Sequence, residues 1–330
     1  MTTKNPKTPT DRLLTPVIIL LSVGGVLYFG LSSVRDNARN NQRNPFEYNI
    51  ERFKKSGEAQ VAFRETAAVA LDLNKPYALA TYRGRIYVTG DRSLLILAGD
   101  GRLLATAATE RPISALAVDA NGDLYAAAGE SVQVLDSTGV KKAQWQDLGV
   151  DAILTSVAVG EKDVYLADAG QLIVWRFNKG GELLGRIGAK DPAKDIPGFV
   201  IPSPYFDLAV DADGFLWVVN SGRHQFENYT PDGRLRSFWS RSSMAIDGFS
   251  GCCNPSHFAL LEDGSFVTSE KGIPRVKIHN VLGDLSAVVA GADQFDEDTV
   301  GLDLAVDESG RILVLDPKRR QVRIFTKKEE

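Results

Sequence analysis

From residue 77 to the C-terminus, apolar and polar positions alternate in short runs separated by glycine, aspartate and asparagine, and no stretch keeps a helical period. β-Branched and aromatic residues dominate these runs, which is typical of β-strands. The pattern recurs at intervals of about 40–50 residues, which indicates a repeat architecture. The six copies open with ALATYRGRIYVTGD (78–91), ALAVDANGDLY (115–125), SVAVGEKDVYLAD (156–168), DLAVDADGFLWVVN (207–220), HFALLEDGSFVTSE (257–270) and DLAVDESGRILVLD (303–316).

Each copy continues into a third run and then, through another glycine turn, into a fourth. Six copies of a four-stranded unit predict an all-β fold, a six-bladed β-propeller with four-stranded antiparallel blades. The last copy ends at Phe325 without an outer strand, whereas residues 58–73 (EAQVAFRETAAVALDL) precede the first copy and have strand character. We therefore expect residues 58–73 to supply the missing strand and to close the ring, which removes its open edges.

The repeats resemble those of the NHL family of β-propellers, in the opening phrase of each copy and in later segments such as SVQVLDSTG (131–139). The resemblance covers roughly residues 60–326. The stretches PSPYFD (202–207), NSGRH (220–224), GCCNP (251–255) and TSEKGIPRVK (268–277) also resemble an uncharacterised group of bacterial membrane-anchored or secreted NHL-type propellers. For this group the resemblance implies a fold but no reaction. The wider superfamily contains both binding modules and metal-dependent lactonases and lyases.

An uncharged, mostly apolar run near the N-terminus predicts a transmembrane helix, for which about 20 residues are sufficient. The alternative is a cleaved signal peptide, but the small residues at the end of the run form only a poor cleavage site. We expect a short tail (1–12), a transmembrane anchor (13–34), a polar juxtamembrane stalk (35–57) that is partly helical around 46–55, and the propeller (58–330).

The charged residues of the chain bear on nucleic-acid binding and on the orientation of the predicted anchor in the membrane. The chain has 38 Lys and Arg against 42 Asp and Glu, a net charge of −4, so the concentrated basic face that nucleic acids require is not expected. Basic residues flank the predicted span on both sides, so the positive-inside rule gives no clear orientation. Because the whole globular part follows a single N-terminal anchor, we expect a single-pass membrane protein whose propeller faces the periplasm or the outside.

Alignment of the six opening phrases predicts which side chains meet at the propeller axis. The third position is alanine in all six copies, and the residue two positions earlier faces the same channel nearer its mouth. That ring consists of Ala78, Ala115, Ser156, Asp207, His257 and Asp303. Two carboxylates beside an imidazole are able to bind a divalent metal ion or to hold His257 as a general base. Alternatively, they bind only ordered water and backbone groups.

Two long connections, 189–205 and 240–256, are expected at the same mouth, since long loops in compact repeat folds are often functional. Polar residues of the neighbouring turns are candidates for binding a small polar ligand or a protein partner. With Ser156, Asp207, His257 and Asp303, these candidates are Tyr205, Asn220, Arg223, His224, Glu270, Lys271 and Arg275. The alternative for each single residue is an ordinary solvated surface. His279 falls in a third strand, where we expect a structural role.

The only two cysteines of the chain, Cys252 and Cys253, are adjacent and lie in the 240–256 loop. Outside the cytoplasm they are candidates for a vicinal disulfide. Two alternatives stay open: a soft-metal site that also uses His257, and a pair of inert buried thiols.

These observations support three functional hypotheses. The first is a membrane-anchored extracytoplasmic module that binds a ligand or a protein through its loop-rich face. The second is a metal-dependent lactonase or lyase with Asp207, His257 and Asp303 at the metal or as acid and base. The third is a structural subunit of a membrane-associated complex. No motif in the chain names a reaction, and an enzyme is the less favoured interpretation.

Overall fold

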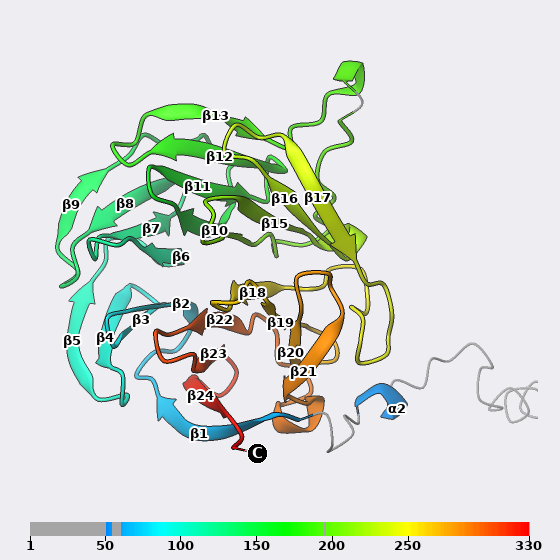
Figure 1. Ribbon diagram of the computed structural model, residues 1–330. Helices are drawn as coiled ribbons and strands as arrows, with labels where there is room; N and C mark the ends of the chain where they lie inside the picture. The colour runs from blue at the N-terminus through cyan, green and yellow to red at the C-terminus, as the bar shows by residue number, and fades with distance from the viewer. Residues whose placement is uncertain (1–50, 55–60, 195, 330) are drawn as a thin grey trace, which may run out of the picture. The chain divides into compact units, whose positions relative to one another are not determined.

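The computed structural model describes residues 51–54, 61–194 and 196–329. Within this part, 24 strands form six four-stranded antiparallel sheets, and Figure 1 shows the sheets arranged in turn around a common axis. This confirms the predicted six-bladed β-propeller. We number the sheets as blades 1 to 6 in the order of their innermost strands.

In the first three blades the strands follow one another from the axis outward. Blade 1 contains β2 (Pro76–Tyr82), β3 (Arg85–Gly90), β4 (Ser93–Ala98) and β5 (Leu103–Ala108). Blade 2 contains β6 (Ile113–Val118), β7 (Leu124–Ala128), β8 (Ser131–Leu135) and β9 (Lys141–Gln144). Blade 3 contains β10 (Leu154–Val159), β11 (Asp163–Asp168), β12 (Ile173–Asn178) and β13 (Leu183–Ile187).

Blades 4 and 5 have the same order, and their short inner strands follow the two long loops. Blade 4 contains β14 (Leu208–Val210), β15 (Leu216–Asn220), β16 (Gln225–Tyr229) and β17 (Leu235–Ser240). Blade 5 contains β18 (His257–Leu260), β19 (Phe266–Ser269), β20 (Val276–His279) and β21 (Leu285–Ala290). The described connections contain the 3₁₀ turns η2 (Pro192–Lys194), η3 (Ser221–Arg223) and η4 (Ala292–Gln294).

Blade 6 closes the ring with strands from both ends of the propeller. It contains β22 (Asp303–Val306), β23 (Ile312–Asp316) and β24 (Gln321–Lys327), and its outer strand is β1 (Phe63–Ala70). β1 pairs antiparallel with β24, and the blue and red ribbons lie side by side in Figure 1. Arg323 of β24 also forms a bidentate ion pair with Glu65 of β1, at 3.1 and 2.6 Å. The prediction that residues 58–73 supply the missing strand is therefore confirmed.

The repeated Asp and Gly of the opening phrases have a direct structural cause. In blade 2, one carboxylate oxygen of Asp119 accepts the backbone N–H groups of Asn121 and Asp123, at 2.8 and 3.0 Å. Gly122, in the same turn, has a φ of 88°, a left-handed conformation that glycine adopts without steric cost. The turn brings β7 back along β6, and the same pair sets the first hairpin of blade 4, with Asp211 and Gly214, and of blade 6, with Asp307 and Gly310.

Apolar side chains of neighbouring blades pack against one another between the sheets. Between blades 4 and 5, the cluster includes Phe226, Trp239, Phe249, Phe258 and Phe266. The rings of Phe226 and Trp239 stack with 4.4 Å between their centroids. Because such clusters fix each blade against the next, they also fix where the inner strands begin at the axis.

The N-terminal predictions concern mostly residues outside the described part. The predicted anchor, 13–34, lies outside it, and the described residues contain no helix long and apolar enough to cross a membrane. One helical turn, α2 (Glu51–Lys54), lies inside the segment 46–55 for which we predict a partial helix.

If β1 closes the ring by packing against blade 6, removing its buried side chain should lower stability. Phe63 of β1 is buried in a cluster with Phe295 and Phe325, so Phe63→Ala should lower the free energy of unfolding by about 3–4 kcal/mol. Arg64, the next residue of the same strand, is exposed, and Arg64→Ala is the matched control with little expected effect. Urea unfolding of both variants checks this. Equal effects would contradict a packed closure of the ring by β1.

Candidate functional site

The inner strand of every blade has one edge without a strand partner, so its backbone groups need other hydrogen-bond partners. Asp207 and Asp303 meet this need across two of the blade junctions. Asp207 accepts the backbone N–H of Phe258 in blade 5 at 2.8 Å, and Asp303 accepts that of Leu79 in blade 1 at 2.7 Å. The other oxygen of each carboxylate accepts the N–H of the following residue in its own strand, at 2.9 Å in both cases.

Hydroxyl groups bridge the remaining junctions, one by accepting a backbone N–H and three by donating to a backbone carbonyl oxygen. Ser156 accepts the backbone N–H of Leu208 between blades 3 and 4, at 3.3 Å. Ser114 donates to the carbonyl oxygen of Leu154 between blades 2 and 3, at 2.8 Å. Thr89 joins blades 1 and 2 through the carbonyl of Ile113 at 2.9 Å, and Ser269 joins blades 5 and 6 through that of Leu302 at 2.7 Å. Each of the six junctions therefore carries at least one side-chain-to-backbone hydrogen bond.

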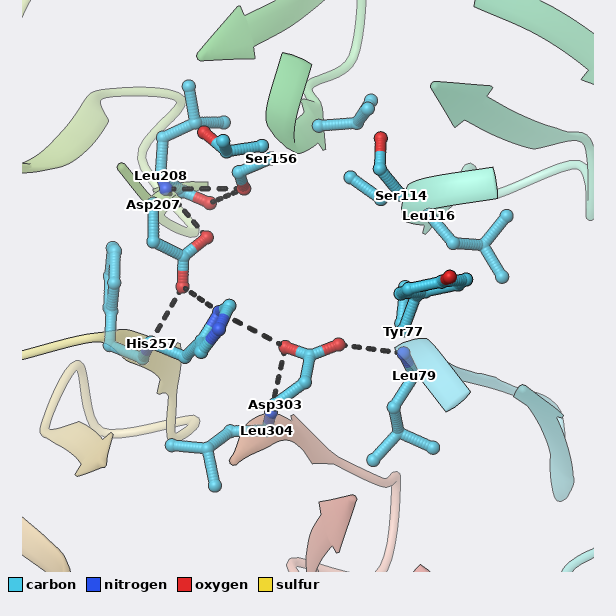
Figure 2. Close-up of a pocket in the computed structure, with 15 residues that line it drawn as sticks. Tyr77, Leu79, Ser114, Leu116, Ser156, Asp207, Leu208, His257, Asp303 and Leu304 are labelled. Atoms are coloured by element: carbon cyan, nitrogen blue, oxygen red, sulfur yellow. Dashed lines mark hydrogen bonds and ion pairs between the residues drawn. The ribbon is translucent and has the colours of Figure 1, made fainter. Parts of the chain in front are cut away.

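The mouth of the axis holds a cavity of about 90 Å³. The predicted ring of six residues lines it: Ala78, Ala115, Ser156, Asp207, His257 and Asp303. Figure 2 shows the imidazole of His257 between the two carboxylates, with Ser156 and Ser114 on other sides of the cavity. Nδ1 of His257 lies 3.7 Å from Oδ2 of Asp207 and 3.6 Å from Oδ1 of Asp303. The side chains of His257 and Asp303 are each 17% exposed, so solvent reaches the group.

The close packing of these three groups shifts two of their pKa values. Burial lowers the pKa of His257, but the nearby carboxylates of Asp207 and Asp303 outweigh it, so the pKa lies above its ordinary value. Burial raises the pKa of Asp303 to about 6, with the charge of His257 opposing the rise and that of Asp207 adding to it. Near neutral pH, two carboxylates thus surround one imidazole, and the cavity has a net negative charge.

The divalent metal site at Asp207, His257 and Asp303 stays a prediction, and the two carboxylates have other partners. Every carboxylate oxygen of Asp207 and Asp303 already accepts a backbone N–H, and both carboxylates face the same ring nitrogen of His257. A metal ion instead needs lone pairs that converge on an empty position. No group of three or more His, Cys, Asp or Glu side chains in the described part of the chain is arranged to hold a metal ion.

Tyr205 and Lys271 come from two different loops and meet beside His257. The ring of Tyr205 lies edge-on to the imidazole, with 5.8 Å between centroids. The Lys271 ammonium lies over the Tyr205 ring at 4.4 Å and donates a hydrogen bond to Ser203 at 3.0 Å. Both side chains are only partly buried, so they form an amphipathic rim next to the charged cavity.

Three residues that we expected at the ligand-facing rim are wholly buried instead. Asn220, Glu270 and Arg275 have no exposed surface. Asn220 holds the 189–205 loop, because its side-chain oxygen accepts the backbone N–H of Val200 at 2.9 Å. Glu270 and Arg275 form an ion pair at 2.9 Å under the 240–256 loop. These three side chains position loops and do not face a ligand.

The ion pair belongs to a larger buried network. Lys277, also fully buried, lies 2.7 Å from Glu270 and donates to the carbonyl oxygen of Gly248 at 2.6 Å. Glu270 also accepts the backbone N–H of Ser250 at 3.2 Å. Burial raises the pKa of Glu270, but Lys277 and Arg275 outweigh it and leave that pKa lowered, while burial lowers the pKa of Lys277 to about 8. The network fixes the loop that leads into His257.

His224 and Arg223 have separate environments. The two ring nitrogens of His224 hydrogen-bond to Ser242 and to the carbonyl oxygen of Gly251, so His224 also anchors the 240–256 loop. Arg223 is exposed and lines a second pocket of about 590 Å³ with Tyr229 and Phe238. It does not line the axial cavity.

His279 lies in β20, the third strand of blade 5, as predicted, and is buried.

The two cysteines are free thiols, with their sulfur atoms 3.1 Å apart. Cys252 is exposed and Cys253 is 4% exposed. The vicinal disulfide therefore stays a prediction.

The sequence analysis did not name Lys277, Ser203 or Asn254 as candidate residues, although each lies in a segment that it singled out. Lys277 offered one signal, since a lysine in an apolar third strand is unusual.

Fold and site together define the chain as a six-bladed β-propeller with a charged axial cavity. No protein-family model matches the chain, and no curated protein matches it in sequence. Solved structures do resemble it. A streptogramin B lyase is 12% identical with a TM-score of 0.57, covering 82% of this chain and 100% of its own. A protein of unknown function from Bacteroides thetaiotaomicron is 16% identical with a TM-score of 0.58, covering 80% of this chain and 72% of its own.

A third structure is a catalytically inactive variant of virginiamycin B lyase from Staphylococcus aureus with quinupristin. It is 10% identical, with a TM-score of 0.55, and the match covers 80% of this chain and 99% of that one. At such low identities these likenesses show the fold alone. The chain thus shares the fold of solved structures that include a streptogramin B lyase and a virginiamycin B lyase.

The pKa of Asp303 predicts a dependence of stability on pH. It is about 6 in the folded protein against an ordinary value of 3.8, so the folded state binds this proton more tightly than the unfolded chain does. The wild type should therefore lose stability relative to Asp303→Asn as pH rises from about 4 to above 6. The full change is at most about 3 kcal/mol, at about 1.4 kcal/mol per unit. The pKa of His257 is also raised in the folded protein, so its titration likewise lowers the stability of the wild type as pH rises.

Urea unfolding of the wild type and Asp303→Asn at several pH values measures this difference. Carboxylates elsewhere in the chain are common to both proteins, so their titration cancels. A stability difference that stays constant with pH would show that Asp303 titrates normally.

The buried network of Glu270, Arg275 and Lys277 predicts a large loss of stability when its carboxylate is removed. Glu270→Gln leaves Arg275 and Lys277 buried without their carboxylate, which should cost about 3–5 kcal/mol in the free energy of unfolding. The control is Asp298→Asn, which breaks the exposed ion pair with Lys318 and should change stability little. If thermal and urea unfolding give similar losses for both variants, the network does not hold the loop.

Proposed function

We propose that the protein is a binding module that recognises a small polar ligand at the axial mouth of its propeller. The observation that carries the proposal is the group formed by Asp207, His257 and Asp303 in a solvent-reached cavity. Two carboxylates face one imidazole, so the group has one negative charge in excess when both acids are ionised and the imidazole is protonated. A ligand with an ammonium or hydroxyl donor complements this charge.

The size of the cavity limits what enters it. The centre of a water-sized sphere has about 90 Å³ in which to move, and about 10–15 Å³ of such space holds one water. The cavity therefore has room for several waters or for a small polar group, and a larger ligand would extend onto the rim. Tyr205 and Lys271 provide an aromatic ring and a cation there, a combination that suits a ligand with both apolar and polar parts.

The proposal includes the membrane arrangement that the sequence predicts. The 13–34 segment would anchor the chain as a single-pass protein, with the propeller outside the cytoplasm, where its mouth meets solutes or partner proteins. The length and lack of charge of the segment support the anchor. Sequencing of the mature N-terminus tests it, since a chain that begins after about residue 34 would have lost the anchor.

A thermal-shift screen of the full-length protein tests ligand binding. We expect small primary amines or polyols to raise the melting temperature and matched carboxylates to leave it unchanged. Free ligand at 100 times its Kd should add about 2.7 kcal/mol to the free energy of unfolding. Asp303→Asn and His257→Gln should abolish the response.

The matched control for the screen is Arg223→Ala, which alters the second pocket and should keep the full response. If no compound class raises the melting temperature, or if the response survives in Asp303→Asn, the proposal fails.

A lyase is the second candidate, and one observation favours it. Both carboxylates face Nδ1 of His257, while Nε2 has no hydrogen-bond partner among the residues that the structure describes. Nε2 is thus available as a general base, with the two acids stabilising the imidazolium that forms. Incubation with quinupristin, the compound with the neighbouring lyase, distinguishes the two functions. Its consumption by the wild type, and not by His257→Gln, would indicate catalysis.

A further inference from the structure

Two thiols lie side by side at the edge of the axial mouth, and they differ in access. The sulfur atoms of Cys252 and Cys253 are 3.1 Å apart and form a hydrogen bond. Cys252 is exposed, whereas Cys253 is 4% exposed. An external reagent therefore meets Cys252 first, and Cys253 is the neighbour within reach of whatever forms on it.

The surrounding loop holds the two thiols in place without a covalent bond. The side-chain amide of Asn254 donates to the carbonyl oxygens of Ser250 and Lys271, at 2.6 and 3.0 Å. In return, the backbone N–H of Lys271 donates to the side-chain oxygen of Asn254 at 3.0 Å. The buried Glu270 fixes the N–H of Ser250. A pair that is positioned in this way needs little rearrangement to react internally.

The polar neighbours act unequally on the two thiols. Burial raises the pKa of Cys253, but hydrogen bonds from Ser203 and Cys252 and the charge of Lys271 outweigh it, so the pKa is lowered. The hydrogen bond to Cys253 raises the pKa of Cys252. The buried Cys253 therefore loses its proton more readily than the exposed Cys252. When the pair has one proton, that proton is on Cys252.

We propose that Cys252 and Cys253 form a thiol–disulfide couple whose oxidant is a low-molecular-weight disulfide. Cys252, after passing its proton to Cys253, attacks one sulfur of the external disulfide, forms a mixed disulfide and releases one small thiolate, which takes up a proton. Cys253 then loses its proton to solvent, and its thiolate attacks the sulfur of Cys252. This breaks the mixed disulfide and releases the second small thiol. The pair gives up two electrons, and the external disulfide becomes two thiols.

Oxidised glutathione, added to the reduced full-length protein, is the probe. Samples are quenched with acid, their free thiols are alkylated, and the intact mass is measured. The wild type should lose both alkylation sites, retain no glutathione and stay monomeric. Cys253→Ser should stop at a stable glutathione adduct on Cys252. Cys252→Ser should resist the reagent, because its remaining thiol is buried.

Lys271→Gln tests the second step. The variant removes the charge that helps to lower the pKa of Cys253, so its thiolate fraction falls by more than its nucleophilicity rises. The glutathione adduct should then persist longer than in the wild type. Circular dichroism confirms that each variant is folded.

Three results would overturn the proposal: a wild type in which both thiols stay alkylatable, one that keeps the glutathione adduct, or one that forms disulfide-linked dimers. An unchanged adduct lifetime in Lys271→Gln would overturn the assignment of Cys253 as the resolving thiolate. These outcomes are independent of ligand binding, so they do not depend on the function proposed above.

Discussion

The unpaired inner edges of six strands determine most of what this propeller presents at its axis. Each inner strand must satisfy backbone groups that no further strand covers. The chain does so with side chains from the neighbouring blade, such as Asp207 on the N–H of Phe258 and Asp303 on the N–H of Leu79. Hydroxyl groups perform the same task at other junctions, as Ser269 does toward Leu302.

The candidate site follows from that constraint. A carboxylate is a stronger acceptor than a hydroxyl, but it also brings a charge to the axis. Where Asp207 and Asp303 bridge their junctions, His257 lies between them, and the cavity is polar and negative. The residues that join the blades are therefore the same ones that give the mouth its chemistry. The rigidity of the ring also fixes the distance of both acids from the imidazole.

Sequence alone was sufficient for the fold and for the axial ring. Both depend on periodicity: the repeated alanine column placed Asp207, His257 and Asp303 on one layer, and the layer lines one cavity. Sequence was not sufficient for the rim. Glu270 and Arg275 are charged loop residues, which normally indicates exposure. Their burial depends on Lys277 in the next strand and on Gly248 in the preceding loop. Such pairing across a loop leaves no periodic signal.

The most direct test of this account is the pKa of His257, measured by nitrogen-15 NMR of the imidazole in the full-length protein. If both carboxylates face one ring nitrogen as described, the pKa lies above the ordinary value of 6.5, and the same measurement on Asp303→Asn gives a lower value. A pKa at or below 6.5 in the wild type, unchanged by Asp303→Asn, would show that the two acids do not hold the imidazole and that the axial group does not exist.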